Sequence, residues 1–214
     1  MKDLIAELEA VRRSVGDATL PAGDAKVVAL SRTYPAPIDD VWDAVTNPER
    51  IPRWFLPITG DLRLGGTYQL EGNAGGEIRV CEAPKRLLVT WVMGDAGPED
   101  SSLVEVRLEP EGDEVTRLVL EHTAVMPPEM WDQFGPGATG VGWDLGLVGL
   151  WAHLTGVETG SPEEMDRDPA VRAAMSHSSD EWGAALAVAG GDPDDVAAKV
   201  AATTAFYVPP LETL

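Results

Sequence analysis

The sequence predicts an α+β fold, in which an antiparallel sheet packs against one long apolar helix and helical segments extend from both ends of the chain. Two observations favour this class. Between Asp61 and Val125, short apolar runs are separated by turns rich in glycine, proline and asparagine, which is typical of consecutive strands joined by hairpins. From Gly140 onward, the apolar residues recur at helical spacing instead.

The N-terminal region is expected to contain one short helix followed by the first strand. The helix is expected over residues 2–15, with Leu4 and Leu8 on its apolar face. After a loop, the first strand should begin at Lys26. It should end before Pro35, because proline has no backbone N–H to donate to a neighbouring strand.

Two short helices are expected next. Pro37 can open the first, because its fixed φ angle suits the first helical turn. Asp39 and Asp40 fall in that turn, where the helix dipole favours acidic side chains. Asn47 and the proline after it should end this helix and begin a second one that reaches about Phe55.

The central region is expected to form a sheet with one buried face and one wet face. Val104, Val106 and Leu108 alternate with charged residues, which places apolar and charged side chains on opposite faces of a strand. Because the strands are consecutive and closely spaced, an antiparallel meander is the natural pairing. Five strands are expected in this region, at about 61–71, 76–83, 86–94, 101–110 and 114–125.

The apolar segment that begins at Gly140 predicts a helix that is covered on nearly all sides. Its tryptophan and leucine residues form one stripe, and Gly142, Gly146 and Gly149 form a second stripe of small residues beside it. Because the rest of the segment is also apolar, one face should lie on the sheet and another should pack against a further element.

The C-terminal segment is the candidate for that further element. Three pairs of a capping residue and a proline begin at Ser161, Asp168 and Asp192, and each pair is a helix-start signal. Trp182 is expected on the buried face of the helix after Asp168. Phe206 is expected on the buried face of the last helix.

The composition restricts the classes of partner and the compartment. The 214 residues include 36 acids and 16 bases, which give a net charge of −20. Nucleic acid and membrane surfaces are therefore not expected as partners, because binding to either usually requires clustered Lys and Arg. The single cysteine, Cys81, cannot form an internal disulfide, and no signal peptide is recognisable, so a cytoplasmic location is expected.

Short motifs in these elements carry a family resemblance. In chain order they are Ser31-Arg32-Thr33-Tyr34, Trp54-Phe55, Leu64-Gly65-Gly66-Thr67-Tyr68, Gly75-Gly76-Glu77-Ile78, Thr116-Arg117-Leu118 and Gly142-Trp143. In this order and spacing they resemble the START-like helix-grip superfamily (SRPBCC). Within it, the sequence is similar to the subfamily named after the heat-shock-protein-90 ATPase activator homologue and to polyketide cyclase-like proteins.

The resemblance covers roughly residues 26–156. It implies a curved antiparallel sheet wrapped around the long C-terminal helix, with a ligand cavity between them. The expected organisation is a helix-grip ligand-pocket domain over 25–157, an N-terminal helical extension over 1–24 and a helical C-terminal extension over 158–214. Because one fold hosts many activities, the resemblance decides the fold better than the function.

Six residues are candidates for binding a ligand in the implied cavity. A pocket of this kind would be mostly apolar, with a few polar groups that orient the ligand. The alternative is that the tryptophans and the leucine are ordinary core residues, because tryptophan buries a large area. The candidates are Trp54, Trp91, Met93, His122, Trp143 and Leu147.

His122 is the candidate that could carry chemistry. It is in phase with Leu118 and Leu120 and should face inward, where it could donate to a ligand or act as an acid or base. The alternative is a core histidine bonded to a backbone carbonyl. The three scattered histidines and the single cysteine predict no metal site, and no motif indicates a cofactor.

These observations leave three functions open. The first is binding of an apolar or aromatic small molecule in the cavity between sheet and helix without catalysis, because no convincing catalytic set is found. The second is a polyketide cyclase- or aromatase-like enzyme that uses His122 as its acid–base group, with Tyr68, Arg79 or Glu121 as a partner. The third is a co-chaperone or partner-binding protein, as the subfamily name suggests. No motif decides between a monomer and a homodimer.

Overall fold

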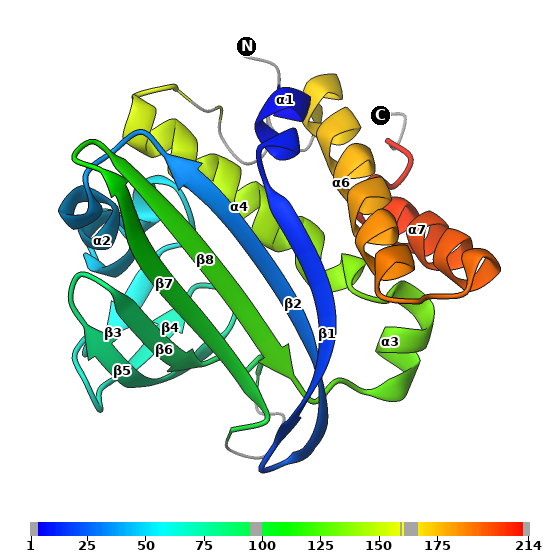
Figure 1. Cartoon of the computed structure of the whole chain (residues 1–214), viewed down its shortest axis with the longest axis horizontal. Helices are drawn as coiled ribbons and strands as arrows, with labels where there is room; N and C mark the ends of the chain where they lie inside the picture. The colour runs from blue at the N-terminus through cyan, green and yellow to red at the C-terminus, as the bar shows by residue number, and fades with distance from the viewer. Residues whose placement is uncertain (1–3, 95–99, 159, 161–166, 212–214) are drawn as a thin grey trace.

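An antiparallel sheet of eight strands is the framework of the fold (Figure 1). The computed structural model describes residues 4–94, 100–158, 160 and 167–211. The strands are β1 (Arg12–Leu20), β2 (Gly23–Tyr34), β3 (Ile58–Gly60), β4 (Thr67–Leu70), β5 (Gly75–Glu82), β6 (Arg86–Thr90), β7 (Ser102–Gly112) and β8 (Val115–Ala124). Across the sheet their order is β1-β2-β8-β7-β6-β5-β4-β3, so the meander from β3 to β8 joins the N-terminal hairpin through the β2–β8 pair.

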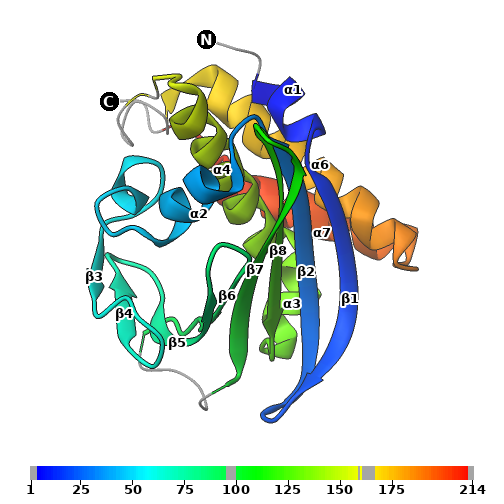
Figure 2. The same ribbon diagram turned by 60° about the vertical axis from the view of Figure 1, so that its left-hand side comes forward.

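Helices cover one face of this sheet. They are α1 (Leu4–Glu9), α2 (Ile38–Thr46), the 3₁₀ turn η1 (Ile51–Arg53), α3 (Pro128–Phe134), α4 (Gly137–Thr155), α6 (Pro169–Val188) and α7 (Pro193–Tyr207). Helices α4 and α6 lie side by side, α4 against β2 and α6 against β1, and α7 packs against α6 (Figure 1). Figure 2 shows that the sheet curves, so that its β3–β5 end turns toward the side on which α2 and α4 lie.

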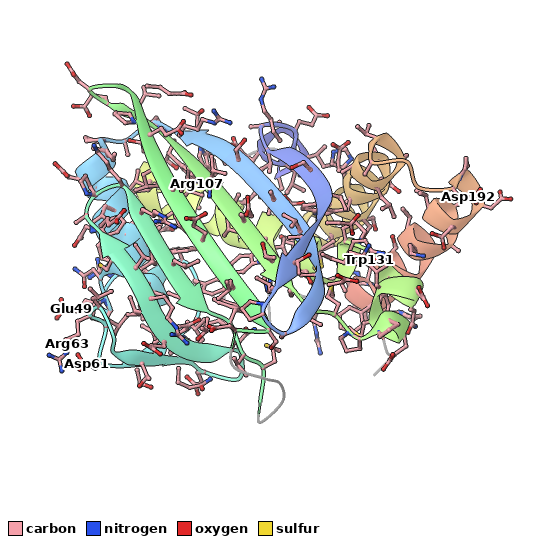
Figure 3. The ribbon with its side chains drawn as sticks, turned by 60° about the horizontal axis from the view of Figure 1, so that its bottom comes forward. Glu49, Asp61, Arg63, Arg107, Trp131 and Asp192 are labelled. Carbon is pink, nitrogen blue, oxygen red and sulfur yellow. The ribbon has the colours of Figure 1, made fainter. Side chains whose placement is uncertain are left out.

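The alternation of apolar and charged residues decides which face of the sheet is buried. Val104, Val106 and Leu108 point into the core, as predicted, whereas Glu105 and Arg107 lie on the outer face. Figure 3 shows the Arg107 side chain on that outer face. The ion pairs there are partly exposed, and such pairs contribute little to stability, so the inward side chains determine the register of the sheet.

The prediction for the N-terminus is wrong in one respect. The helix expected over residues 2–15 ends at Glu9, and Arg12–Leu20 forms the edge strand β1, which pairs with β2 through a two-residue turn. Without β1, the long strand β2 would expose its backbone N–H and C=O groups at a sheet edge. Pairing of these groups outweighs the helical pattern of the apolar residues, so residues 12–24 belong to the sheet rather than to a helical extension.

Other element boundaries also differ from the predictions. The strand expected over 61–71 is divided into β3 and β4, because residues 61–66 form the connection between them. Helix α3 was not expected, and none of its residues is fully buried. The helix start expected at Ser161 lies outside the described residues, and the strands expected over 76–83, 86–94, 101–110 and 114–125 correspond to β5 to β8.

The C-terminal helices cover α4, as the sequence predicted. The side chains of Asp168 and Asp192 accept hydrogen bonds from backbone N–H groups in the first turns of α6 and α7. Trp182 is 1% exposed and packs on α4 at Gly140, where a Cβ atom would lie 2.2 Å from the indole ring. The prediction for Phe206 is wrong, because its side chain is 62% exposed.

A buried polar network connects β1, α4 and α6. The Asp144 carboxylate is fully buried and accepts hydrogen bonds from Arg13 Nε at 2.9 Å, Ser178 Oγ at 2.5 Å and Trp182 Nε1 at 3.0 Å. Burial raises the pKa of Asp144, whereas the neighbouring guanidinium and the three donors favour its ionised form. The other Arg13 nitrogens donate to Glu181 and to two backbone carbonyls, so the guanidinium of Arg13 is satisfied.

The Arg13–Asp144 network generates a first prediction. Substitution of Asp144 by alanine removes the buried counter-ion of Arg13 and leaves its guanidinium only the partly exposed Glu181, which should lower the free energy of unfolding by about 3–5 kcal/mol. Urea denaturation of the full chain measures this loss. The matched control is Glu181→Ala, which removes the partly exposed partner of the same guanidinium and should cost less than about 1 kcal/mol. Equal losses for the two variants would contradict the importance assigned to the buried pair.

Candidate functional site

An apolar cavity of about 130 Å³ lies between the sheet and α4. Strands β4 to β8 contribute its sheet wall, α4 contributes the opposite wall, and α2 with the segment from η1 to β3 closes one side. Cys81 is exposed and also lines the cavity, so the cavity reaches the surface near the end of β5. In the part of the chain that the structure describes, no charged side chain lines this space.

Five aromatic side chains form much of the lining. Trp143 stands at their centre, with ring centroids 4.8 Å from Trp91 and 6.2 Å from Phe55. Trp54 stacks on Phe55 at 5.4 Å, and Tyr68 lies 6.3 Å from Trp91. A flat apolar molecule in the cavity would therefore contact several aromatic rings, which favour offset or edge-on contacts with other rings.

The glycines of α4 allow the aromatic segment after η1 to approach the helix closely. A Cβ atom at Gly149 would lie 2.6 Å from the carbonyl oxygen of Trp54, which is too close for any other residue. At Gly146 a Cβ atom would lie 3.5 Å from the ring of Phe55, an ordinary contact distance. Two of the three glycines of the small-residue stripe, Gly146 and Gly149, therefore face the Trp54–Phe55 segment, whereas Gly142 faces Tyr207. Gly146 also lines the cavity.

The polar groups around the cavity mostly donate to the protein itself. Tyr68 Oη donates to the carbonyl of Thr90 at 2.8 Å, and burial raises the pKa of this tyrosine. Thr46 Oγ1 donates to a carbonyl one turn earlier in α2 at 2.7 Å, and Trp54 Nε1 donates to another α2 carbonyl at 3.0 Å. These groups hold the walls in place and have no second hydrogen to offer a ligand.

Four of the six candidate residues meet at this cavity: Trp54, Trp91, Trp143 and Leu147 line it. The prediction for Met93 is wrong, because its side chain is 57% exposed and lies outside the cavity. It has the same phase as Trp91, but β6 ends at Thr90 and a single bridge between Val92 and Gly75 follows it. Met93 comes after that bridge and directly before Gly94, whose φ angle is positive.

Several residues that line the cavity were not among the six predicted candidates. The sequence indicates Phe55 only as the end of a helix, whereas in the structure it forms part of the aromatic wall. Four further lining residues lie on the inward face of β7 and β8: Val104, Val106, Leu118 and Leu120. The alternation of apolar and charged residues in the sequence indicates that these side chains face inward, but not that they border a cavity.

His122 is 8% exposed and faces inward, as predicted, but it lies behind the cavity wall rather than in the lining. Trp143 Nε1 donates to its Nδ1 at 3.1 Å, and its Nε2 lies 2.9 Å from Ser102 Oγ. Because an indole N–H only donates, Nδ1 is unprotonated and Nε2 carries the hydrogen of the neutral ring. Burial lowers the pKa of His122 to about 4, so this neutral form prevails at pH 7.

The partners of His122 differ from both sequence hypotheses. The hypothesis of a core histidine assumed a backbone carbonyl, whereas both partners are side chains. The hypothesis of an acid–base group required a second polar residue, yet Tyr68 is bonded to a carbonyl and Glu121 pairs with Arg107 on the outer face. His122 accepts the indole N–H of Trp143 and so orients this ring in the cavity wall.

Within the described ranges, no group of three His, Cys, Asp or Glu side chains is arranged to hold a metal ion. In the same ranges, no helix has the length and apolar character needed to cross a membrane.

The low pKa of His122 generates a second prediction. Between pH 7.5 and 5.5 an unfolded histidine gains a proton while the folded one does not, so folding loses stability as the pH falls. A folded pKa of about 4 against 6.5 when unfolded corresponds to a loss of about 1.4 kcal/mol over this interval.

Urea denaturation of the wild type and of His122→Asn at both pH values isolates this contribution, because the carboxylates titrate alike in the two proteins. Asparagine can still accept from Trp143, and the variant should lack the histidine-dependent part of the slope. Identical pH dependence of the two proteins would show that the folded histidine titrates normally.

Comparisons with known proteins agree with this architecture. Residues 35–154, more than half of the chain, match the family described as Activator of Hsp90 ATPase homolog 1-like protein. A comparison with curated proteins finds no significant match. The crystal structure of CalU16 from Micromonospora echinospora is 38% identical, with a TM-score of 0.67, and the match covers 83% of this chain and 98% of CalU16.

Two further solved structures are similar. The solution NMR structure of CalU16 from the same organism is 38% identical, with a TM-score of 0.68, over 86% of this chain and 97% of that one. DynU16, described as a protein in the dynemicin biosynthetic locus, is 26% identical, with a TM-score of 0.53, over 60% of this chain and 47% of DynU16. The fold, the matched family and the CalU16 structures together show that this chain belongs to the Activator of Hsp90 ATPase homolog 1-like family of the helix-grip (SRPBCC) superfamily.

Proposed function

We propose that this protein binds an apolar, aromatic small molecule in the cavity between the sheet and α4. The observation that carries the proposal is the cavity itself, with its volume of about 130 Å³ and its aromatic walls. Protein cores rarely contain voids larger than a water molecule. An empty cavity of this size lowers stability by about 3 kcal/mol, and a bound apolar ligand would recover much of this loss.

The relatives support a ligand from small-molecule biosynthesis. DynU16 is described as a protein in the dynemicin biosynthetic locus, and its similarity covers the greater part of this chain. A protein encoded in a biosynthetic locus can encounter the small organic molecules of that pathway as ligands. The proposed ligand is therefore an intermediate or product of a biosynthetic pathway rather than a macromolecule.

The geometry favours binding over catalysis. Both ring nitrogens of His122 are engaged, and its ring does not line the cavity, so it is poorly placed to exchange a proton with a bound molecule. A co-chaperone function rests on the description of the family alone. Neither the catalytic nor the co-chaperone alternative is supported by a contact in the described residues, whereas the binding hypothesis is supported by the apolar cavity in the core.

Filling the cavity tests this proposal. Val106 lines it from β7, so Val106→Phe should place a ring inside the cavity and abolish binding of apolar aromatic compounds. Val119→Phe is the matched control, because Val119 lies between two lining residues of β8 and points to the opposite face of the sheet.

The measurement is the change in Tm of the full chain with a panel of neutral aromatic compounds, combined with native mass spectrometry of each complex. A bound compound at a hundred times its Kd should stabilise the wild type and Val119→Phe by about 2.7 kcal/mol and leave Val106→Phe unaffected. If no compound raises the Tm of the wild type, or if Val106→Phe responds equally, the cavity is not a binding site.

A further inference from the structure

Gly146 lines the cavity from the middle of α4, where a glycine is costly for the helix. We propose that Gly146 determines which ligands fit, by keeping open the space for one uncharged aromatic ring beside Phe55. This inference rests on the proposed function and adds to it the size and charge of the ligand. Gly146 would be the residue that sets the specificity of the cavity.

Packing explains Gly140 and Gly149 of α4 but not Gly146. A Cβ atom at Gly140 would lie 2.2 Å from the ring of Trp182, and one at Gly149 would lie 2.6 Å from the carbonyl oxygen of Trp54, so both positions must be glycine. At Gly146 the nearest atom would be the Phe55 ring at 3.5 Å, so an alanine fits without displacing any neighbour. A methyl group added at this position would instead occupy part of the cavity volume.

The volume of the cavity indicates the size of the ligand. Apolar cavities of about 150 Å³ in other proteins admit benzene, and this cavity measures about 130 Å³. A methyl group at Gly146 occupies roughly as much space as one water molecule, ~30 Å³, and would remove roughly a quarter of the cavity. One six-membered ring therefore fits inside the wild-type space, whereas a second fused ring would have to extend toward the opening near Cys81.

The lining indicates that the bound ring is uncharged. No charged side chain of the described residues lines the cavity, so an anion or a cation would lose its hydration without gaining a counter-ion. The hydroxyl of Tyr68 and the ring N–H groups of Trp54 and Trp143 already donate to other protein groups. Shape and contact with aromatic faces are left as the means of recognition.

The experiment compares Gly146→Ala with a matched variant of the same helix. Gly142→Ala is the control, because a Cβ atom there would lie 3.4 Å from Tyr207 Oη, and Gly142 does not line the cavity. Each substitution replaces a helical glycine by alanine and should raise the Tm of the unliganded protein by a few degrees. Toluene, benzoate and naphthalene serve as probes in calorimetric and NMR titrations of the full chain.

The inference expects the wild type and Gly142→Ala to bind toluene with equal affinity and Gly146→Ala to bind it at least ten-fold more weakly despite its higher Tm. Benzoate and naphthalene should bind at least ten-fold more weakly than toluene to the wild type. Equal toluene affinity of the two glycine variants would overturn the role of Gly146.

The other outcomes separate the inference from the proposed function. Tight binding of benzoate would overturn the requirement for an uncharged ring. Binding of naphthalene but not of toluene would overturn the size limit while leaving the proposed function intact. If neither neutral compound binds and none of a wider neutral aromatic panel raises the Tm, the proposed function fails together with the inference.

Discussion

The apolar character of α4 around nearly its whole circumference is the constraint on which the rest of the structure depends. A helix of this kind cannot expose any face to water without losing hydrophobic stabilisation, so each side requires a cover. The sheet covers one side, α6 covers a second and the Trp54–Phe55 segment covers a third. The cavity lies where these covers meet the sheet without filling the space completely.

Close approach and buried charge fix the positions of these covers. Glycines at 140 and 149 allow Trp182 and Trp54 to reach the helix backbone. The fully buried carboxylate of Asp144 accepts hydrogen bonds from both β1 and α6, so it ties the edge strand and the C-terminal extension to the same helix. Because a buried charge tolerates few arrangements of its partners, this contact specifies how the extension docks as well as holding it in place.

The cavity combines a rigid polar support with an apolar interior. His122 holds the indole of Trp143 from behind, and its low pKa keeps this hydrogen bond in one tautomer at neutral pH. Among the described residues, none that lines the interior carries a charged side chain. A wall that is rigid and already satisfied loses little conformational entropy when a ligand binds, which favours binding by shape.

The sequence by itself determined the fold class, the long apolar helix, the caps of α6 and α7 and four residues of the cavity wall. These features depend on periodicity, on capping chemistry and on motifs that are local in the chain. Only the tertiary structure decided that residues 12–20 form a strand, that Arg13 meets Asp144 and that Met93 lies outside the cavity. Each of these depends on pairing or contact between different segments of the chain. The free energy of such contacts outweighs local conformational preference, and no pattern within a single segment indicates them.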